Sequence, residues 1–134
     1  SGALYGSGYM AASRYCTGKD YLDVHSLYEM YEAMLQEIMK RGKTEPGQKT
    51  MLDALSQALL AYKAALDAQA DEKEIIKSFI EGAKQGAEST RDMEAVKGRA
   101  SYRTDKGVGH LDPGAVTMAM QLESMGTIIL EKLK

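Results

Sequence analysis

The stretch SLYEMYEAMLQEIMKR, residues 26–41, decides the fold class. Its large apolar side chains recur at three- and four-residue intervals, the spacing of one face of an α-helix: Leu27, Tyr31, Met34 and Ile38, with Tyr28, Leu35 and Met39 widening the stripe. Gly42 follows as the expected C-cap, because glycine readily adopts the left-handed conformation that ends many helices. The pattern predicts an amphipathic helix over residues 26–41.

Further helices are predicted along the chain, separated by turn residues. Residues 43–49 contain Pro46-Gly47 and form a turn. The next helix has the buried face Met51, Leu55, Leu59, Tyr62 and Leu66. Asp71, with Glu74 three residues on, begins a helix that runs to about Met93 and buries Ile75, Ile76, Phe79 and Ile80. Asp112 as N-cap and Pro113 as first helical residue start a last helix that buries Met118, Leu122, Met125, Ile129 and Leu133.

The remaining segments are shorter or irregular. One short helix is predicted over residues 6–16. Residues 96–113 have no helical period and are predicted to form a long loop, and such loops are usually functional or disordered. Gly82, Ala83, Gly86 and Ala87 let a neighbour approach their helix closely, either another helix or a ligand. Because no segment alternates like a strand, the sequence predicts one all-α domain over residues 1–134.

Composition excludes several classes of function. The chain has 17 basic and 19 acidic residues and a net charge of −2, which gives no electrostatic footprint for nucleic acid. The basic cluster Lys40, Arg41 and Lys43 is explained by a helix C-terminus, whose dipole favours cations. There is neither an apolar run long enough to span a membrane nor a signal-peptide layout. The single cysteine, Cys16, indicates a reducing compartment, and we expect a cytoplasmic protein.

The common catalytic motifs are absent. His25 and His110 are the only histidines, so zinc-site spacings do not occur. There is no P-loop, and the helical pattern offers no strand for a dinucleotide-binding loop or a nucleophile elbow. Three polar, glycine-bearing segments remain at predicted helix ends: residues 1–6, 41–51 and 97–114. Helix ends present unpaired amide groups and a dipole, so such segments can form an anion or nucleotide site.

These segments resemble the dihydroxyacetone kinase nucleotide-binding domain. The matching strings are Ser1-Gly2-Ala3-Leu4-Tyr5-Gly6, Arg41-Gly42-Lys43-Thr44-Glu45-Pro46-Gly47, Lys49-Thr50-Met51-Leu52-Asp53, Gly98-Arg99-Ala100-Ser101-Tyr102, and Gly109-His110-Leu111-Asp112-Pro113-Gly114-Ala115. The resemblance implies an antiparallel helical barrel, of which this chain would hold about five of eight helices. Lys97-Gly98-Arg99 and Gly109-His110 look more like the separate bacterial subunit than the single-chain ATP-dependent kinases.

In the bacterial system, the resemblance implies, ADP remains bound as a cofactor. A phosphohistidine-bearing phosphotransfer subunit rephosphorylates it, and the resulting ATP phosphorylates dihydroxyacetone held on another subunit. The family binds Mg²⁺ through aspartates of an N-terminal segment that has no counterpart in this chain. We therefore expect no catalytic or metal-binding residue in this chain, and no activity from it alone, because phosphoryl transfer depends on those metals.

The resemblance also implies which residues bind the nucleotide. They are Ser1 in a phosphate-binding turn, Gly42 and Met51 in the adenine pocket, Arg99 facing the phosphates, and the turn Asp112, Pro113 and Gly114. Each has a plainer explanation: Met51 also fits the buried face of its helix, Arg99 could be solvated, and Asp112 and Pro113 also start a helix. His110 could hydrogen-bond within its loop, and Gln48 stands where the family often has aspartate.

Two other functions remain open. One is the nucleotide domain of an ATP-dependent single-chain dihydroxyacetone kinase, and the other is a helical interaction module without catalysis. Because a barrel that lacks some of its helices exposes apolar faces, we also expect a homo-oligomer or a covering partner chain.

Overall fold

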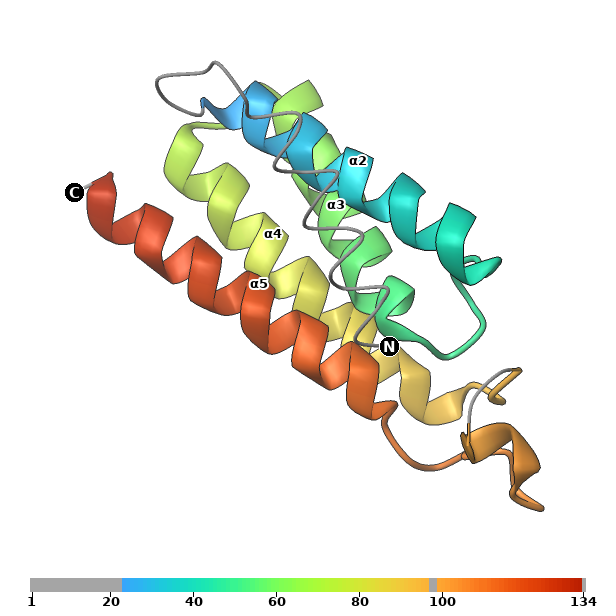
Figure 1. The fold of residues 1–134 in the computed structure, drawn as a ribbon. Helices are drawn as coiled ribbons and strands as arrows, with labels where there is room; N and C mark the ends of the chain where they lie inside the picture. The colour runs from blue at the N-terminus through green and yellow to red at the C-terminus, as the bar shows by residue number, and fades with distance from the viewer. Residues whose placement is uncertain (1–22, 97–98, 134) are drawn as a thin grey trace. The chain divides into compact units, whose positions relative to one another are not determined.

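The computed structural model describes residues 23–96 and 99–133, and these residues form helices, turns and loops without a strand. The α-helices are α2 (Val24–Gly42), α3 (Met51–Asp67), α4 (Glu72–Ser89) and α5 (Pro113–Lys132), and two 3₁₀ turns are η1 (Thr90–Asp92) and η2 (Arg99–Tyr102) (Figure 1). The all-α prediction is confirmed for this part of the chain. The helix expected over residues 6–16 lies outside the described residues.

The chain divides into two compact units, residues 1–45 and residues 46–134. In the first unit, Asp23 caps α2 by accepting a 2.7 Å hydrogen bond from the Ser26 amide. The predicted stripe of α2 is confirmed, since these side chains are buried: Leu27, Tyr31, Met34, Leu35 and Ile38. The predicted C-cap is wrong by one residue. The left-handed conformation falls on Lys43, at φ 47°, and Gly42 is the last residue of the helix.

The second unit is built from α3, α4 and α5, which pack on one another in every pair. Helix α4 runs antiparallel to α3 and α5, so its C-terminal end lies near the N-terminal ends of the other two (Figure 1). In the core, the rings of Tyr62 and Phe79 meet edge to face at 5.5 Å. The core also contains these fully buried side chains: Leu52, Leu55, Ile76, Met118 and Leu122.

Glycines bring α3 and α4 into backbone contact. A Cβ atom on Gly86 would lie 2.2 Å from the Asp53 carbonyl oxygen, and one on Gly82 would lie 2.7 Å from the Gln57 carbonyl oxygen. The small residues of α4 therefore receive another helix, which is the first of the two explanations offered by the sequence. A Cβ atom on Gly126 of α5 would lie 2.5 Å from Cγ1 of the Ile80 side chain.

The predicted buried faces are partly wrong near helix ends. Met118 and Leu122 are buried as expected, but Met125 is 38% exposed, and Ile129 and Leu133 are half-buried. The stripe of α5 passes through Gly126 instead, which is buried where the helix packs against the Ile80 side chain. Two other predicted core residues are half-buried, Leu66 and Ile80. The helix expected to reach Met93 ends as an α-helix at Ser89 and continues as η1.

Replacing Gly86 by alanine tests the backbone contact. The new methyl group would collide with backbone atoms that cannot rotate away, so we expect the free energy of unfolding to fall by about 1–3 kcal/mol. Gly126→Ala is the matched control, because its methyl group meets only side-chain atoms, those of Ile80 and Ile76, and it should cost less. Urea unfolding followed by circular dichroism measures both. Equal stability of Gly86→Ala and the unmodified chain would contradict the packing described.

Candidate functional site

The N-terminal ends of α3 and α5 meet at one end of the second unit. A Cβ atom on Gly114 would lie 3.8 Å from both the backbone nitrogen and the Cβ of Met51, and 3.1 Å from the Asp112 carboxylate. Pro113 is the first residue of α5. The structure thus brings together four residues predicted for the nucleotide site: Met51, Asp112, Pro113 and Gly114. Two first turns side by side direct two positive dipole ends to the same region, a setting that favours an anion.

Both helix ends carry side-chain caps. Asp112 accepts a 2.9 Å hydrogen bond from the Ala115 amide, so its expected capping role is confirmed. Thr50 caps α3 through the Leu52 amide at 3.1 Å, and Asp53 completes a capping box by accepting from the Thr50 amide at 2.8 Å. The other oxygen of Asp53 accepts from the Gly47 amide at 2.6 Å. Asp53 therefore fixes the loop before α3 to the first turn of that helix.

Lys49 is the first of two residues at this end of the second unit that the sequence did not single out. Its side chain is 97% buried, and its ammonium donates hydrogen bonds to the carbonyl oxygens of Thr90 and His110. Its backbone is left-handed, at φ 59°. A lysine in a predicted turn normally extends into solvent, so neither periodicity nor composition signals this burial. The only signal is its place in the matched string that begins at Lys49.

Thr90 is the second residue that the sequence did not single out. It is fully buried at the end of α4, and its hydroxyl donates to the Ala87 carbonyl at 2.6 Å. The same oxygen accepts a 2.9 Å hydrogen bond from the Asp112 amide. His110 takes part through its backbone carbonyl, which accepts from Lys49. The end of α4 is thereby joined to the start of α5.

The charges around Asp112 act in opposite directions. Burial, with a smaller contribution from Asp53, raises the pKa of Asp112 above its ordinary value of 3.8. The Ala115 amide and the Lys49 ammonium oppose this rise. A half-buried carboxyl at the site is thus less acidic than an exposed one.

The other predicted site residues lie elsewhere or outside the described part. Gly42 ends α2 in the first unit and is half-buried. Arg99 begins η2, but its side chain is not among those described, and Ser1 lies outside the described residues. Of the loop expected over residues 96–113, the described residues 103–112 lie outside helices, residues 99–102 form η2, and Pro113 already belongs to α5. A 2.7 Å hydrogen bond joins the Gly109 amide to the Arg91 carbonyl.

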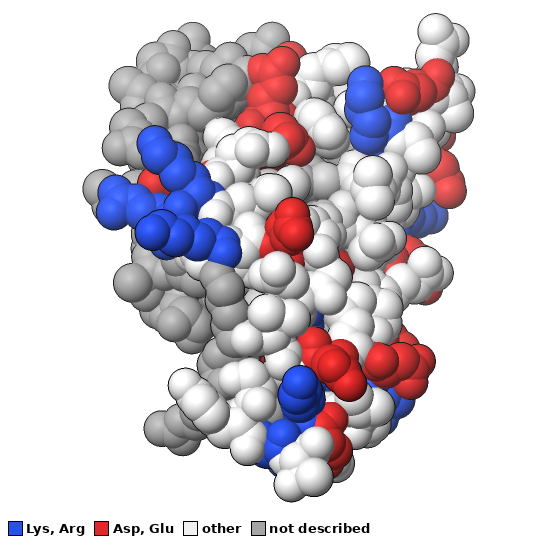
Figure 2. Space-filling view, turned by 90° about the vertical axis from the view of Figure 1, so that its right-hand side faces the viewer, with Lys and Arg blue, Asp and Glu red and all other residues white. Residues whose placement is uncertain are grey.

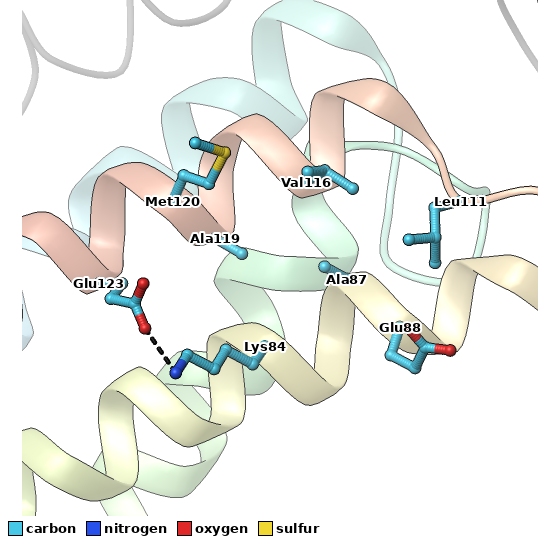
Figure 3. A pocket seen from close by; sticks show the side chains of 8 residues that line it. All are labelled: Lys84, Ala87, Glu88, Leu111, Val116, Ala119, Met120 and Glu123. Carbon is cyan, nitrogen blue, oxygen red and sulfur yellow. Dashed lines mark ion pairs between the residues drawn. The ribbon is translucent and has the colours of Figure 1, made fainter.

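A groove of about 210 Å³ lies between α4 and α5 and begins beside Leu111, next to Asp112 (Figure 3). Val116 and Met120 of α5 give it apolar walls, and Lys84 and Glu123 form an ion pair across it. The groove can accept an apolar group, and its ion pair closes one side.

Basic and acidic side chains both occur on the face drawn in Figure 2, and neither charge covers it. Among the residues that the structure describes, no three His, Cys, Asp or Glu side chains form a group able to hold a metal ion. No helix in the same residues is long and apolar enough to cross a membrane.

Comparison with known families identifies the family of the chain. The model of the DAK2 domain matches residues 1–127 of the chain. The chain belongs to the DAK2 domain family. The match covers every residue predicted to contact nucleotide, from Ser1 to Gly114.

Relatives of this DAK2 domain chain include bacterial kinase subunits and longer proteins. It is 34% identical, over 93% of its length, to a PEP-dependent dihydroxyacetone kinase 1 ADP-binding subunit of Listeria innocua, and 30% identical, over 93%, to an Escherichia coli ADP-binding subunit. The alignments cover 57% and 60% of those two proteins, so the chain spans less than two thirds of each. It is 37% identical, over 93% of its length, to human triokinase/FMN cyclase, of which 21% is covered.

The raised pKa of Asp112 predicts a pH-dependent effect of Asp112→Asn. Asparagine also caps helices but carries no charge. Because the folded chain holds the Asp112 proton at pH values where the unfolded chain has lost it, this carboxyl costs stability as pH rises from about 3.8. We expect the stability of Asp112→Asn relative to the unmodified chain to increase from about pH 3 to about pH 7.

Urea unfolding at several pH values measures this difference. Asp71→Asn is the control, because Asp71 caps α4 through the Glu74 amide from an exposed position, where no burial opposes its charge. A relative stability of Asp112→Asn that falls as pH rises would contradict the described environment.

Proposed function

We propose that this chain is the nucleotide-holding part of an ADP-binding subunit of a dihydroxyacetone kinase. In this proposal, bound ADP receives a phosphoryl group from the phosphohistidine of a phosphotransfer subunit. The resulting ATP then phosphorylates dihydroxyacetone on a partner kinase subunit. Relatives described as ADP-binding subunits support the nucleotide, and the observation that carries the proposal is the contact of Gly114 with Met51 where two helix N-termini meet.

The residues at these helix ends suit a nucleoside diphosphate. Gly114 leaves its backbone uncovered by a side chain, so a phosphate group could approach the first turn of α5. The side chain of Met51 is 5% exposed, which limits any adenine contact to its edge. Gly42, Arg99 and Ser1 would complete the site, with Gly42 beside adenine and the other two on the phosphates. Bound ADP supplies the acceptor oxygen, and these residues bind and orient it.

The described residues do not fit the Mg²⁺ of the family. They offer no group of three His, Cys, Asp or Glu side chains that could hold the ion. We assign no step to a metal among the described residues, and Mg²⁺ would take its ligands from outside them. The proposed role of the chain is nucleotide binding, without a catalytic residue of its own.

The alternative donor is ATP itself, as in a single-chain kinase. Identity does not separate the two possibilities, because the chain is 35% identical to an L-erythrulose 1-kinase of Mycolicibacterium smegmatis and 37% identical to human triokinase/FMN cyclase. These values match or exceed those for the ADP-binding subunits. We favour the phosphohistidine donor because the Lys97-Gly98-Arg99 and Gly109-His110 strings look more like the bacterial subunit.

Association with other chains forms part of the proposal. Met120 and Ile128 of α5 are 63% and 53% exposed, and Leu60 of α3 is 63% exposed. These side chains support contact with a kinase subunit or a second copy, because large exposed apolar side chains often mark interfaces. We also propose that residues 1–134 form a single domain that acts in the cytoplasm.

Arg99→Gln tests the phosphate contact. Because hydrogen bonds to charged groups contribute about 1.5–3 kcal/mol, we expect ADP to bind roughly 10- to 100-fold more weakly and adenosine to be unaffected. Arg103→Gln is the matched control, since Arg103 belongs to the same loop but is exposed and paired with Asp105. Calorimetric titration with and without Mg²⁺ measures binding. Binding of ADP to residues 1–134 that requires Mg²⁺ would refute the absence of a metal site, and no binding at all would refute the nucleotide site.

A donor assay separates the two kinase proposals. The full-length subunit, loaded with ADP, is mixed with a ³²P-labelled phosphohistidine subunit. A labelled phosphoryl group should move from the histidine nitrogen to the β-phosphate oxygen of bound ADP and form ATP. Thin-layer chromatography detects this product. A parallel reaction supplies free ATP labelled on its γ-phosphate. Labelled dihydroxyacetone phosphate from this ATP, without transfer from phosphohistidine, would select the ATP-dependent alternative.

A further inference from the structure

Lys49 is a buried charge whose described partners are backbone carbonyls. Its side chain is 3% exposed, and charged side chains are almost never so buried unless their hydrogen bonds are satisfied. The ammonium donates to the carbonyls of Thr90 and His110, which lie 41 and 61 residues farther along the chain. A cation placed in this way joins distant segments of backbone.

The two carbonyls belong to the ends of different helices. Thr90 is the C-cap residue of α4, where carbonyls lack partners within the helix and the helix dipole favours a cation. His110 lies two residues before Asp112, the N-cap of α5. The backbone of Lys49 directly precedes Thr50, the N-cap of α3. One ammonium group therefore connects the start of α3, the end of α4 and the start of α5.

Neighbouring contacts fix the two ends of this link. Asp53 holds the loop around Lys49 by accepting from the Gly47 and Thr50 amides. The Thr90 hydroxyl accepts from the Asp112 amide at 2.9 Å while its carbonyl accepts from Lys49. The left-handed backbone of Lys49 is a strained conformation that persists only where its surroundings hold it.

We propose that Lys49 is a positioning residue, which holds the N-terminal ends of α3 and α5 in the arrangement that receives the nucleotide. The inference rests on the proposed function for the ligand, whereas the positioning of the helix ends can be measured without it. Methionine has a similar length and would fill the space, but it has no donor for the two carbonyls. The helix ends would therefore lose their alignment while the core remained folded.

The test compares Lys49→Met with a restored ammonium. In a Cys16→Ser background, Lys49→Cys has a single thiol. Alkylation of the unfolded chain with bromoethylamine rebuilds a lysine-like side chain, and alkylation with iodoacetamide gives a neutral one. Lys63→Met is the matched control, because Lys63 lies on α3 in an exposed pair with Asp67.

Two quantities are measured on each variant. Amide hydrogen exchange by NMR, without nucleotide, compares the Gly109 and Asp112 amides with those of Ile76 and Phe79 in the core of α4. Titration calorimetry gives the affinity for ADP. We expect Lys49→Met to speed exchange at Gly109 and Asp112 at least tenfold more than in α4, and to weaken ADP binding by about tenfold or more. The aminoethyl side chain should restore both, and the neutral one neither.

Several results would overturn the proposal. One is an ADP affinity of Lys49→Met equal to that of Lys63→Met, and another is exchange that rises equally in α4 and at Asp112. Restoration by the neutral side chain would show that the positive charge is not needed. If Lys49→Met does not fold, the two alkylated forms decide in its place. If the unmodified chain does not bind ADP, the proposed function fails, and exchange in the aminoethyl and neutral forms alone decides whether Lys49 positions the helix ends.

Discussion

The backbone contact between α4 and the first turn of α3 constrains everything at the candidate site. Gly86 approaches the Asp53 carbonyl so closely that no side chain fits between the helices. Helix α4 therefore finishes beside the start of α3, and Thr90, four residues after Gly86, comes within reach of Lys49. Without that approach, the carbonyl at the end of α4 would lack its cation, and the loop to α5 would lack its anchor on the Thr90 hydroxyl.

The charged side chains at this end of the second unit bind different kinds of backbone group. Carboxylates hold backbone amides: Asp53 fixes the loop before α3, and Asp112 caps α5. Lys49 holds backbone carbonyls, so each kind of backbone group meets a side chain of complementary charge. Two carboxyl groups near a proposed phosphate site would repel the ligand. The dipoles of two helix N-termini and the Lys49 ammonium lessen that repulsion.

Local patterns predicted the helices well, and tertiary contacts account for the errors. Asp71 and Asp112 cap their helices as their positions indicated, because capping depends on residues within one turn. Met125 was expected in the core because periodicity counts apolar side chains and ignores glycine, whereas the α5 contact runs through Gly126. The links from Lys49 span 41 and 61 residues, so no local pattern could reveal them. For the candidate site, the family resemblance identified the matching stretches of sequence. The structure added that Gly114 lies close to Met51.

The proposed nucleotide-holding role of this part of the protein would account for the overlap of identities among relatives. The described network joins helix ends to one another, and such a scaffold would serve any enzyme that holds a nucleotide here, whatever its phosphate donor. This would explain why a relative of which the alignment covers 57% and a relative of which it covers 21% have similar identities to this chain. Donor choice would then depend on surfaces that contact other subunits or domains, because a scaffold restricts a fold and leaves the chemistry to the groups placed around it. The exposed side chains of α5 would be one such surface in this proposal, because they lie on the helix whose first turn belongs to the proposed site.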